Sequence, residues 1–252
     1  MGTEAQRSRV LVSIDDTDNL ESRGTGWRAR RLGALLHERN LARVRGISRH
    51  QLHVHARIPM TSHNSALCLD IEWRGGDAAD LATLTRAFLK EESAPGSDAG
   101  FCLARFEDVG ANIVAFGRRA KTSVVHQGEA RELAREGGFH LEGVTGDEGG
   151  VIGALASIGL RKSGHDGRFV WVAGVRELEG VTTPRRLLGS TGIDIVRPLA
   201  GEAISEDARI SIDPWPRPVL LEDKAVLLVS KVEEPHAGFD WKLVPREIIK
   251  QY

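Results

Sequence analysis

The stretch RVLVSIDDTDN, residues 9–19, decides how the chain begins to fold. Along residues 9–15, successive side chains would point to opposite faces of a strand, and the segment ends in acids. This pattern predicts a β-strand that reaches the edge of a sheet. Three carboxylates, Asp15, Asp16 and Asp18, stand within four positions at the end of this strand. The strand therefore brings a concentrated negative charge to one place.

The elements that follow predict an α+β fold with α/β-like layers. Apolar residues at helical spacing predict an amphipathic helix over residues 25–40, so the chain opens with a strand and a helix. Alternation predicts a β-hairpin from residues 51–58 and 65–73, and helical spacing returns over residues 78–91. Other predicted helices cover residues 107–116, 129–136, 151–160 and 184–189.

A junction between two parts of the chain is predicted at the loop ESAPGSDAG, residues 92–100, which is dense in Ser, Pro, Gly and Asp. We expect residues 1–95 to form a first part that carries the acidic motif. Residues 96–252 would form a second α+β part that carries the motif GDEGGVIGA.

Composition excludes several classes of protein. Apolar residues make up 41% of the 252 residues and charged residues 27%, which is typical of a folded globular chain. The formal net charge of -1 excludes a globally basic coat for nucleic acid. Between residues 23 and 57, however, nine arginines and four histidines accompany only one acid, Glu38. This region is either a solvated helix face with strand arginines or a surface for an anionic ligand.

Cysteine usage and hydropathy predict a soluble cytoplasmic protein. Cys68 and Cys102 each lie in an apolar run, and no CxxC pair is present for a zinc ribbon. We expect both to be core thiols. The N-terminal residues are polar, and no apolar run approaches the roughly 18 residues of a membrane span.

The acidic cluster is the first candidate site. Repulsion among Asp15, Asp16 and Asp18 must be offset by a cation or by hydrogen-bond donors. Mg²⁺ suits such a cluster, because it uses one or two carboxylates and leaves its other positions to water and phosphate oxygens. A turn or a helix cap would need one aspartate rather than three. The hydroxyl of Thr17 either accepts a phosphoryl group or caps the turn.

The second candidate is GDEGGVIG, residues 146–153, where glycines open a helix after a strand. Backbone N–H groups at a helix start bind phosphate, and Gly146, Gly149, Gly150 and Gly153 would let a ligand approach closely. No Lys or Ser/Thr follows as a Walker A motif requires. A helix start that is packed tightly by small residues remains the alternative.

A third glycine motif, GTGWRA at residues 24–29, matches the dinucleotide fingerprint GxGxxA. It lies nine residues beyond the strand, whereas the Rossmann turn is tight, so the match is coincidental. Gly24, Thr25 and Gly26 then form a phosphate-facing loop or a plain loop.

Two of these motifs together resemble one known family. SIDDTDN, residues 13–19, followed by Gly24-Thr25-Gly26, is similar to the opening of the archaeal tRNA(Ile) agmatinylcytidine (agmatidine) synthetases, whose first strand ends in IDDTDS. GDEGGVIGALASI, residues 146–158, resembles that family's GNxRGLIGALAAI. RIPMTSHNSA, residues 57–66, stands where the family has a turn containing asparagine.

The resemblance implies a kinase-like catalytic domain with a ferredoxin-like domain. It also implies that ATP and Mg²⁺ activate the C2 carbonyl of a tRNA cytidine for attack by agmatine. Asp15, Asp16 and Asp18 would hold metal and triphosphate, and Thr17 would be phosphorylated. The glycines of residues 146–153 would shape the phosphate or substrate cleft.

The chain also departs from this family. By Tyr252 neither the OB-fold nor the zinc ribbon that grip tRNA has followed, so a partner protein would supply tRNA binding. GTGWRARR, residues 24–31, replaces the family's CTTY element, and Gly149 stands where the family has an arginine. These changes lie where substrate or nucleotide contacts belong, which is compatible with a different acceptor and continued use of ATP. The alternative is a nucleotide- or RNA-binding module that has lost its chemistry.

Overall fold

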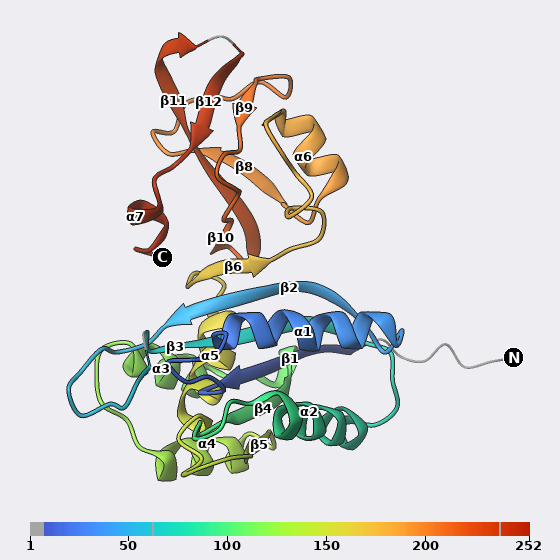
Figure 1. Cartoon of the computed structure of the whole chain (residues 1–252), viewed down its shortest axis with the longest axis vertical. Coiled ribbons are helices and arrows are strands. Elements are labelled where there is room, and N and C mark those ends of the chain that lie inside the picture. The colour runs from blue at the N-terminus through green and yellow to red at the C-terminus, as the bar shows by residue number, and fades with distance from the viewer. Residues whose placement is uncertain (1–7, 62, 237) are drawn as a thin grey trace, which may run out of the picture. The chain divides into compact units, whose positions relative to one another are not determined.

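The computed structural model describes residues 8–61, 63–236 and 238–252 (Figure 1). The chain forms two compact units, of which the first extends to Ser163 and the second comprises Gly164–Tyr252. The junction expected between residues 95 and 96 therefore falls inside the first unit. Loop 92–100 instead connects α2 (Ala78–Glu92) to β4 (Gly100–Arg105), an inner strand of the first unit's sheet.

The first unit is built on a sheet in the order β5-β4-β1-β3-β2, with every neighbouring pair antiparallel. Strand β1 is central because its residues 10–14 are all buried, so both of its faces are covered. The strands are β1 (Ser8–Asp15), β2 (Ala42–Gln51), β3 (Ser65–Trp73), β4 (Gly100–Arg105) and β5 (His140–Gly143).

Helices cover both faces of this sheet. On one face, α3 (Ala111–Ala120), α4 (Gln127–Glu136) and α5 (Val151–Ser163) share a core with the strands through residues such as Leu11 and Phe116. On the other, Gly33 of α1 (Thr25–Glu38) lies against Ile47 and Leu69. Helix α2 contacts α1 and begins with a capping box at Asp77. A short 3₁₀ turn, Phe106–Asp108, links β4 to α3.

A buried ionic cluster ties β3 to β1 and α5. The carboxylate of Asp70, which is 1% exposed, accepts bonds from Arg9 (2.6 Å) and Arg161 (2.5 Å). Buried carboxylates persist only when paired, because desolvation of an isolated charge is costly. The cluster thus fixes α5, whose first turn borders the site described below.

The second unit contains a mixed sheet in the order β6-β10-β11-β12-β9-β7, with β8 parallel to β11. Its core includes Leu187, Leu227 and Trp241. The strands are β6 (Arg168–Trp171), β7 (Val181–Thr182), β8 (Ile195–Pro198), β9 (Ile210–Ser211), β10 (Val219–Leu221), β11 (Lys224–His236) and β12 (Phe239–Leu243), and the helices are α6 (Pro184–Ser190) and α7 (Arg246–Ile249).

The α+β class and most predicted elements are confirmed, including the first strand, the first helix and the strand over residues 65–73. The strand predicted over residues 51–58 is wrong. Strand β2 ends at Gln51, and the chain leaves the sheet at Leu52, whose N–H bonds to Asn64 outside the ladder. Val54, the residue that suggested alternation, is 63% exposed. The helix predicted over residues 107–116 begins four positions later, at Ala111.

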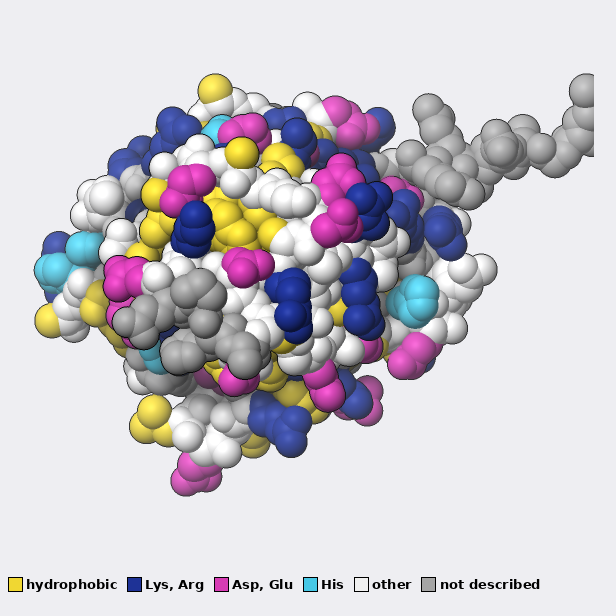
Figure 2. All heavy atoms as spheres, turned by 90° about the horizontal axis from the view of Figure 1, so that it is seen from above, with side chains coloured by type: hydrophobic (Ala, Val, Ile, Leu, Met, Phe, Trp, Pro, Cys, Tyr) yellow, Lys and Arg dark blue, Asp and Glu magenta, His cyan; other side chains and the backbone are white. Residues whose placement is uncertain are grey.

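Positive and negative side chains are mixed on the surface, as the formal net charge of -1 suggests. Figure 2 shows one face of the molecule on which Lys and Arg side chains are interspersed with Asp and Glu and do not gather into one patch. Within the described ranges, no helix has the length and apolar content that a membrane crossing requires.

Candidate active site

The acidic loop, residues 15–18, begins where β1 leaves the sheet. Asp16 has a φ of 53°, a left-handed conformation that aspartate adopts more readily than most residues. The carbonyl of Asp15 and its carboxylate both approach the start of α5. A strained backbone at the end of a strand is a recurrent feature of functional sites.

Hydroxyl groups hold the shape of this loop. The buried Thr17 donates a hydrogen bond through Oγ1 to Thr25 Oγ1 (3.0 Å), and Thr25 donates to Asp18 Oδ1 (2.7 Å). Thr61 donates to the other carboxylate oxygen of Asp18 (3.3 Å). The first turn of α1 and loop 52–64 therefore fix the direction of the Asp18 carboxylate.

The glycine segment, residues 146–153, lies directly against the acidic loop. A methyl group at Gly153 would overlap the carboxylate of Asp15, so only glycine leaves room for that carboxylate over the first turn of α5. At Gly150 a Cβ would lie 2.6 Å from the nitrogen of Gly100 and 2.7 Å from the carbonyl oxygen of Asp15. The predicted packing of a helix start by small residues is thus present, and it joins the two motifs.

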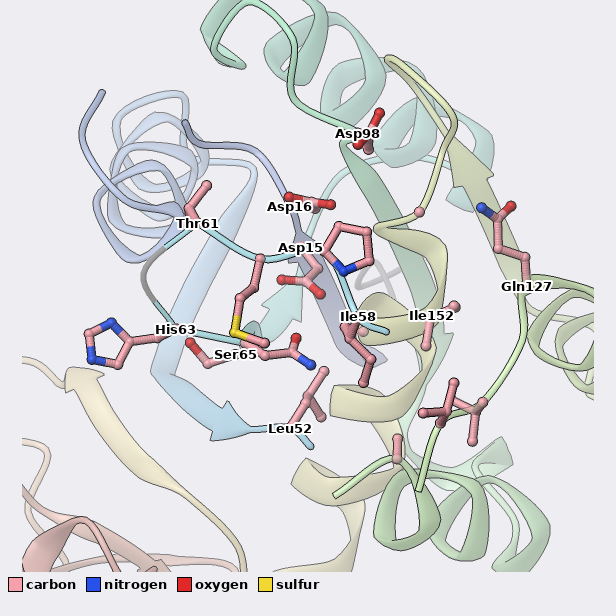
Figure 3. Close-up of a pocket in the computed structure, with 18 of the residues that line it drawn as sticks. Asp15, Asp16, Leu52, Ile58, Thr61, His63, Ser65, Asp98, Gln127 and Ile152 are labelled. Carbon is pink, nitrogen blue, oxygen red and sulfur yellow. The ribbon is translucent and has the colours of Figure 1, made fainter. Parts of the chain in front are cut away.

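Both motifs line one cavity of about 400 Å³, a size typical of small-molecule sites (Figure 3). Asp15, Asp16 and Asp98 lie toward one end of the view, and Leu52 lies toward the other. Further lining residues come from the glycine segment, from loop 52–64 and from the α3–α4 connection: Gly149, Ile152, Gly153, Arg57, Ile58, Pro59, Met60, Thr61, His63, Asn64, Val124, Val125, His126 and Gln127.

The electrostatics of the cavity favour a bound cation. Burial, followed by the adjacent carboxylate of Asp16, raises the pKa of Asp15 to about 8. Burial, followed by Asp98, Asp18 and Asp147, raises the pKa of Asp16 to about 6. Carboxyl groups that repel each other in this way gain most from a nearby positive charge.

Asp15, Asp16 and Asp18 could hold a Mg²⁺ ion only if phosphate oxygens or water completed its coordination. Among the described residues, no group of three or more His, Cys, Asp and Glu side chains is arranged as a metal site. Mg²⁺ does not need such a group, because one or two carboxylates suffice when phosphate oxygens complete its octahedron. The carboxylates of Asp15, Asp16 and Asp18, which line the cavity, could provide these ligands.

The backbone N–H groups at the start of α5 are already partnered within the protein. Gly149 donates to the Asp147 side chain (2.8 Å), Gly150 to the Asp98 carbonyl (2.8 Å) and Val151 to the Glu148 carbonyl (3.1 Å). The glycine segment therefore contributes space and close packing in this conformation, and direct phosphate binding by these groups stays a prediction.

The predicted site residues fall into two groups. Those that line the cavity are Asp15, Asp16, Asp18, Thr25, Gly149 and Gly153. Gly24, Gly26, Gly146, Gly150 and Thr17 do not line it: Gly24 caps α1, Gly26 is the second residue of α1, and Gly146 lies against Asp98. Because the Thr17 hydroxyl is buried and hydrogen-bonded, its phosphorylation would require the acidic loop to open.

Sequence reasoning missed Asp98 as a member of the site. Asp98 stands just before β4, in a loop interpreted as a domain junction. Its Oδ1 accepts the N–H of Asp147 (2.8 Å), so it holds the glycine segment in place. Pairing of Gly100 with Asp15 at the start of β4 places Asp98 beside the end of β1. Only the strand order reveals this proximity.

Several arginines of the arginine-rich region, residues 23–57, form contacts within the protein. Arg28 is buried and donates to the Glu92 carbonyl (2.5 Å), while Arg31 pairs with the Glu92 carboxylate (2.7 Å). Arg43 and Arg45 both pair with Glu72. Of this region, Arg57 lines the cavity. The structure thus favours the interpretation of a solvated, internally paired surface.

Comparison with known proteins yields similarity at the level of the fold. No protein-family model and no curated protein matches the chain. The agmatidine synthetase TiaS, in complex with its isoleucine tRNA, AMPCPP and agmatine, matches with a TM-score of 0.51 and 23% identity, covering 60% of this chain and 36% of that one. TiaS with the same tRNA and ATP matches with a TM-score of 0.52 and 24% identity over the same shares.

The apo form of TiaS gives a TM-score of 0.51 at 24% identity. The chain therefore spans about a third of the length of these proteins. The resemblance noted in the sequence extends to a shared mixed α+β fold.

Proposed function

We propose that the chain is an ATP- and Mg²⁺-dependent phosphoryl-transferring enzyme that activates a carbonyl group, of a tRNA cytidine or a related acceptor, for attack by an amine. The observation that carries the proposal is the meeting of the acidic loop and the glycine segment at one cavity. The two motifs are far apart in the chain, at residues 15–18 and 146–153, and they are the two that resemble the agmatidine synthetases.

The role of each group follows from its position. When bound, Mg²⁺ and ATP would supply a charge-neutralised phosphoryl group for transfer. Asp15, Asp16 and Asp18 would hold the cation, and the bonds from Thr25 and Thr61 keep the Asp18 carboxylate in place. Gly153 leaves the space that the Asp15 carboxylate occupies.

The acceptor would contact cavity residues other than the carboxylates. These residues combine apolar side chains such as Ile58, Val125 and Ile152 with the polar groups of Asn64 and Gln127. Apolar surface with a few polar groups suits a flat heterocycle that must be oriented by hydrogen bonds. A small amine such as agmatine would be attracted by the carboxylates.

The finer domain assignment belongs to the same proposal. The first unit would be the kinase-like catalytic part, and a ferredoxin-like arrangement would belong to the remaining α+β part. Binding of tRNA with the help of a partner protein belongs to the same proposal.

The test uses one substitution that closes the cavity and one that does not. In Gly153→Ala the new methyl group collides with the Asp15 carboxylate, whereas at Gly128 in α4 no atom lies within 4 Å of the added methyl group. We expect Mg²⁺-ATP binding, measured by calorimetry, in the unsubstituted protein and in Gly128→Ala, and its loss in Gly153→Ala.

Turnover is measured in the same proteins with tRNA, agmatine and other amines. Release of ADP or AMP that depends on an acceptor supports the enzyme. Binding of ATP with no turnover for any acceptor supports the alternative, a binding module without chemistry. If ATP neither binds nor turns over, the proposal is wrong.

A further inference from the structure

The second unit exposes a large aromatic side chain, Trp215, in the segment DPWPRP at residues 213–218. Its side chain is 47% exposed, whereas Trp241 of the same unit is 6% exposed and belongs to the core. Prolines at positions 214, 216 and 218 fix their φ angles, so the segment presents Trp215 with little backbone freedom. An aromatic ring held rigidly at the surface suits a ligand that stacks on it.

Arginine side chains surround this ring. The guanidinium carbon of Arg176 lies 5.1 Å from the ring centroid, and that of Arg217 lies 5.6 Å from it. Both distances are within the range of cation–π contacts. Arg246, from α7, shares a cavity with Trp215 and Arg217. Two arginines therefore bring positive charge to one exposed indole, and Arg246 adds a third guanidinium group to the adjoining cavity.

The charge of these arginines is not neutralised by neighbouring acids. Within the part of the chain that the structure describes, no ion pair forms to Arg176, Arg217 or Arg246. Elsewhere in the unit, Arg185 pairs with Glu206 (3.0 Å) and Asp207 (3.1 Å). Burial, followed by the like charge of Arg246, lowers the pKa of Arg217. An anion placed between these two guanidinium groups would relieve their repulsion.

The cavity beside Trp215 has a volume of about 310 Å³. Its lining includes apolar Leu228, Val244 and Ile249, and its charged lining consists of Arg217, Arg246 and one acid, Asp213. A cavity lined by both apolar and cationic side chains matches a ligand that has an aromatic part and an anionic part.

We propose that this cluster, Trp215 with Arg176, Arg217 and Arg246, binds single-stranded nucleic acid, with a base stacked on the indole and the adjoining phosphates at the guanidinium groups. Bases stack on aromatic rings and on guanidinium planes in single-strand recognition, and arginine forks match phosphate oxygens. Three cations spread over separate segments suit successive phosphates of a strand. The inference concerns the second unit by itself and does not rest on the proposed function of the first.

The experiment measures binding of a fluorescently labelled oligouridine of about 12 nucleotides to the full chain by anisotropy. We compare the unsubstituted protein with Trp215→Leu, Arg246→Gln and a control, Arg185→Gln, which removes an equal charge from a paired arginine of the same unit. Circular dichroism checks that each variant is folded. Trp215→Leu keeps an apolar side chain at the site.

We expect Trp215→Leu to weaken binding by about 5- to 150-fold, the loss of one stacked base. Arg246→Gln should lower the slope of log affinity against log salt by about 0.7, the value for one phosphate contact on a single strand. Arg185→Gln should bind like the unsubstituted protein. ATP binding without RNA should be the same in Trp215→Leu as in the unsubstituted protein, so the two proposals fail separately.

Two results would overturn the inference. One is equal affinity of Trp215→Leu and Arg185→Gln for the oligonucleotide. The other is competition by uridine monophosphate at the same concentration as the oligonucleotide, which would identify the cluster as a site for a free nucleotide.

Discussion

Replacing Asp16 by Asn should stabilise the protein at pH 8 when no divalent cation is present. Burial, followed by the charges of Asp98, Asp18 and Asp147, raises the pKa of the Asp16 carboxyl group from 3.8 to about 6. Asn removes the charge without removing the side chain, and it tolerates the left-handed φ of 53° at this position. The substitution therefore isolates the electrostatic effect.

The magnitude follows from linkage between proton binding and folding. Each unit of pKa difference corresponds to about 1.4 kcal/mol, so a rise of about two units corresponds to roughly 3 kcal/mol as an upper limit. Partial exposure to water screens the charge, which reduces the expected gain to about 1–2 kcal/mol. A carboxyl group with a raised pKa in the folded state costs stability as the pH rises from 3.8 toward about 6. The difference in unfolding free energy between Asp16→Asn and the unsubstituted protein should therefore grow across this pH window and stay constant above it.

The assay is native-state hydrogen exchange in peptides from β1 and β4, which reports the opening of the first unit alone. It is run in the presence of a chelator at several pH values, with each variant compared at the same pH. Asp240→Asn, at an exposed position in the second unit, is the control. If Asp16→Asn is no more protected than the unsubstituted protein at pH 8, the charge on Asp16 does not destabilise the folded first unit.

Addition of Mg²⁺ should raise the melting temperature of the unsubstituted protein, by mass action, and leave Asp16→Asn nearly unchanged; equal shifts in calorimetry would contradict a cation site at the acidic loop. Asp70→Asn should destabilise the first unit by about 3–5 kcal/mol in urea unfolding, because Arg9 and Arg161 lose the charge that they pair with, whereas Asp207→Asn on the surface should cost less than about 1 kcal/mol. Gly159→Ala should also destabilise the protein, by about 1–3 kcal/mol, since its methyl group would overlap the carbonyl of Ile113 in α3; stability in urea equal to that of Gly128→Ala would exclude this close helix contact.

The sequence predicted those helices and strands whose own pattern of apolar residues shows which side chains are buried. Strand β1 is apolar enough to be recognised, and α5 consists of small and apolar residues that must pack on all sides. The acidic loop and the glycine segment were found for the same reason, since each is a short contiguous motif. Their meeting at one cavity depends on β4 pairing with β1, which no local pattern contains.

Features set by distant contacts were missed. Strand β2 was predicted at residues 51–58, too late in the chain. Its ten residues include several arginines, and a bulge between Val44 and Gly46 interrupts the alternation of buried and exposed positions. Asp98 was overlooked since a loop rich in Ser, Pro and Gly is typical of a linker, although here it carries a residue of the cavity. The cavity wall from residues 120–127 likewise arises only from the packing of α3 and α4.

Where Gly150 touches Gly100 and Asp15, main chain meets main chain, and no side chain remains that evolution or an engineer could trim to widen the cavity. Space for a bulkier acceptor must therefore come from other lining residues, such as Ile58, Met60, Val125 and Gln127, whose side chains differ in size. Libraries for altered substrate preference should randomise these positions and hold Thr61 and the glycines constant. Because the glycine contacts are fixed and the other lining side chains can change, the same fold could accommodate several acceptors.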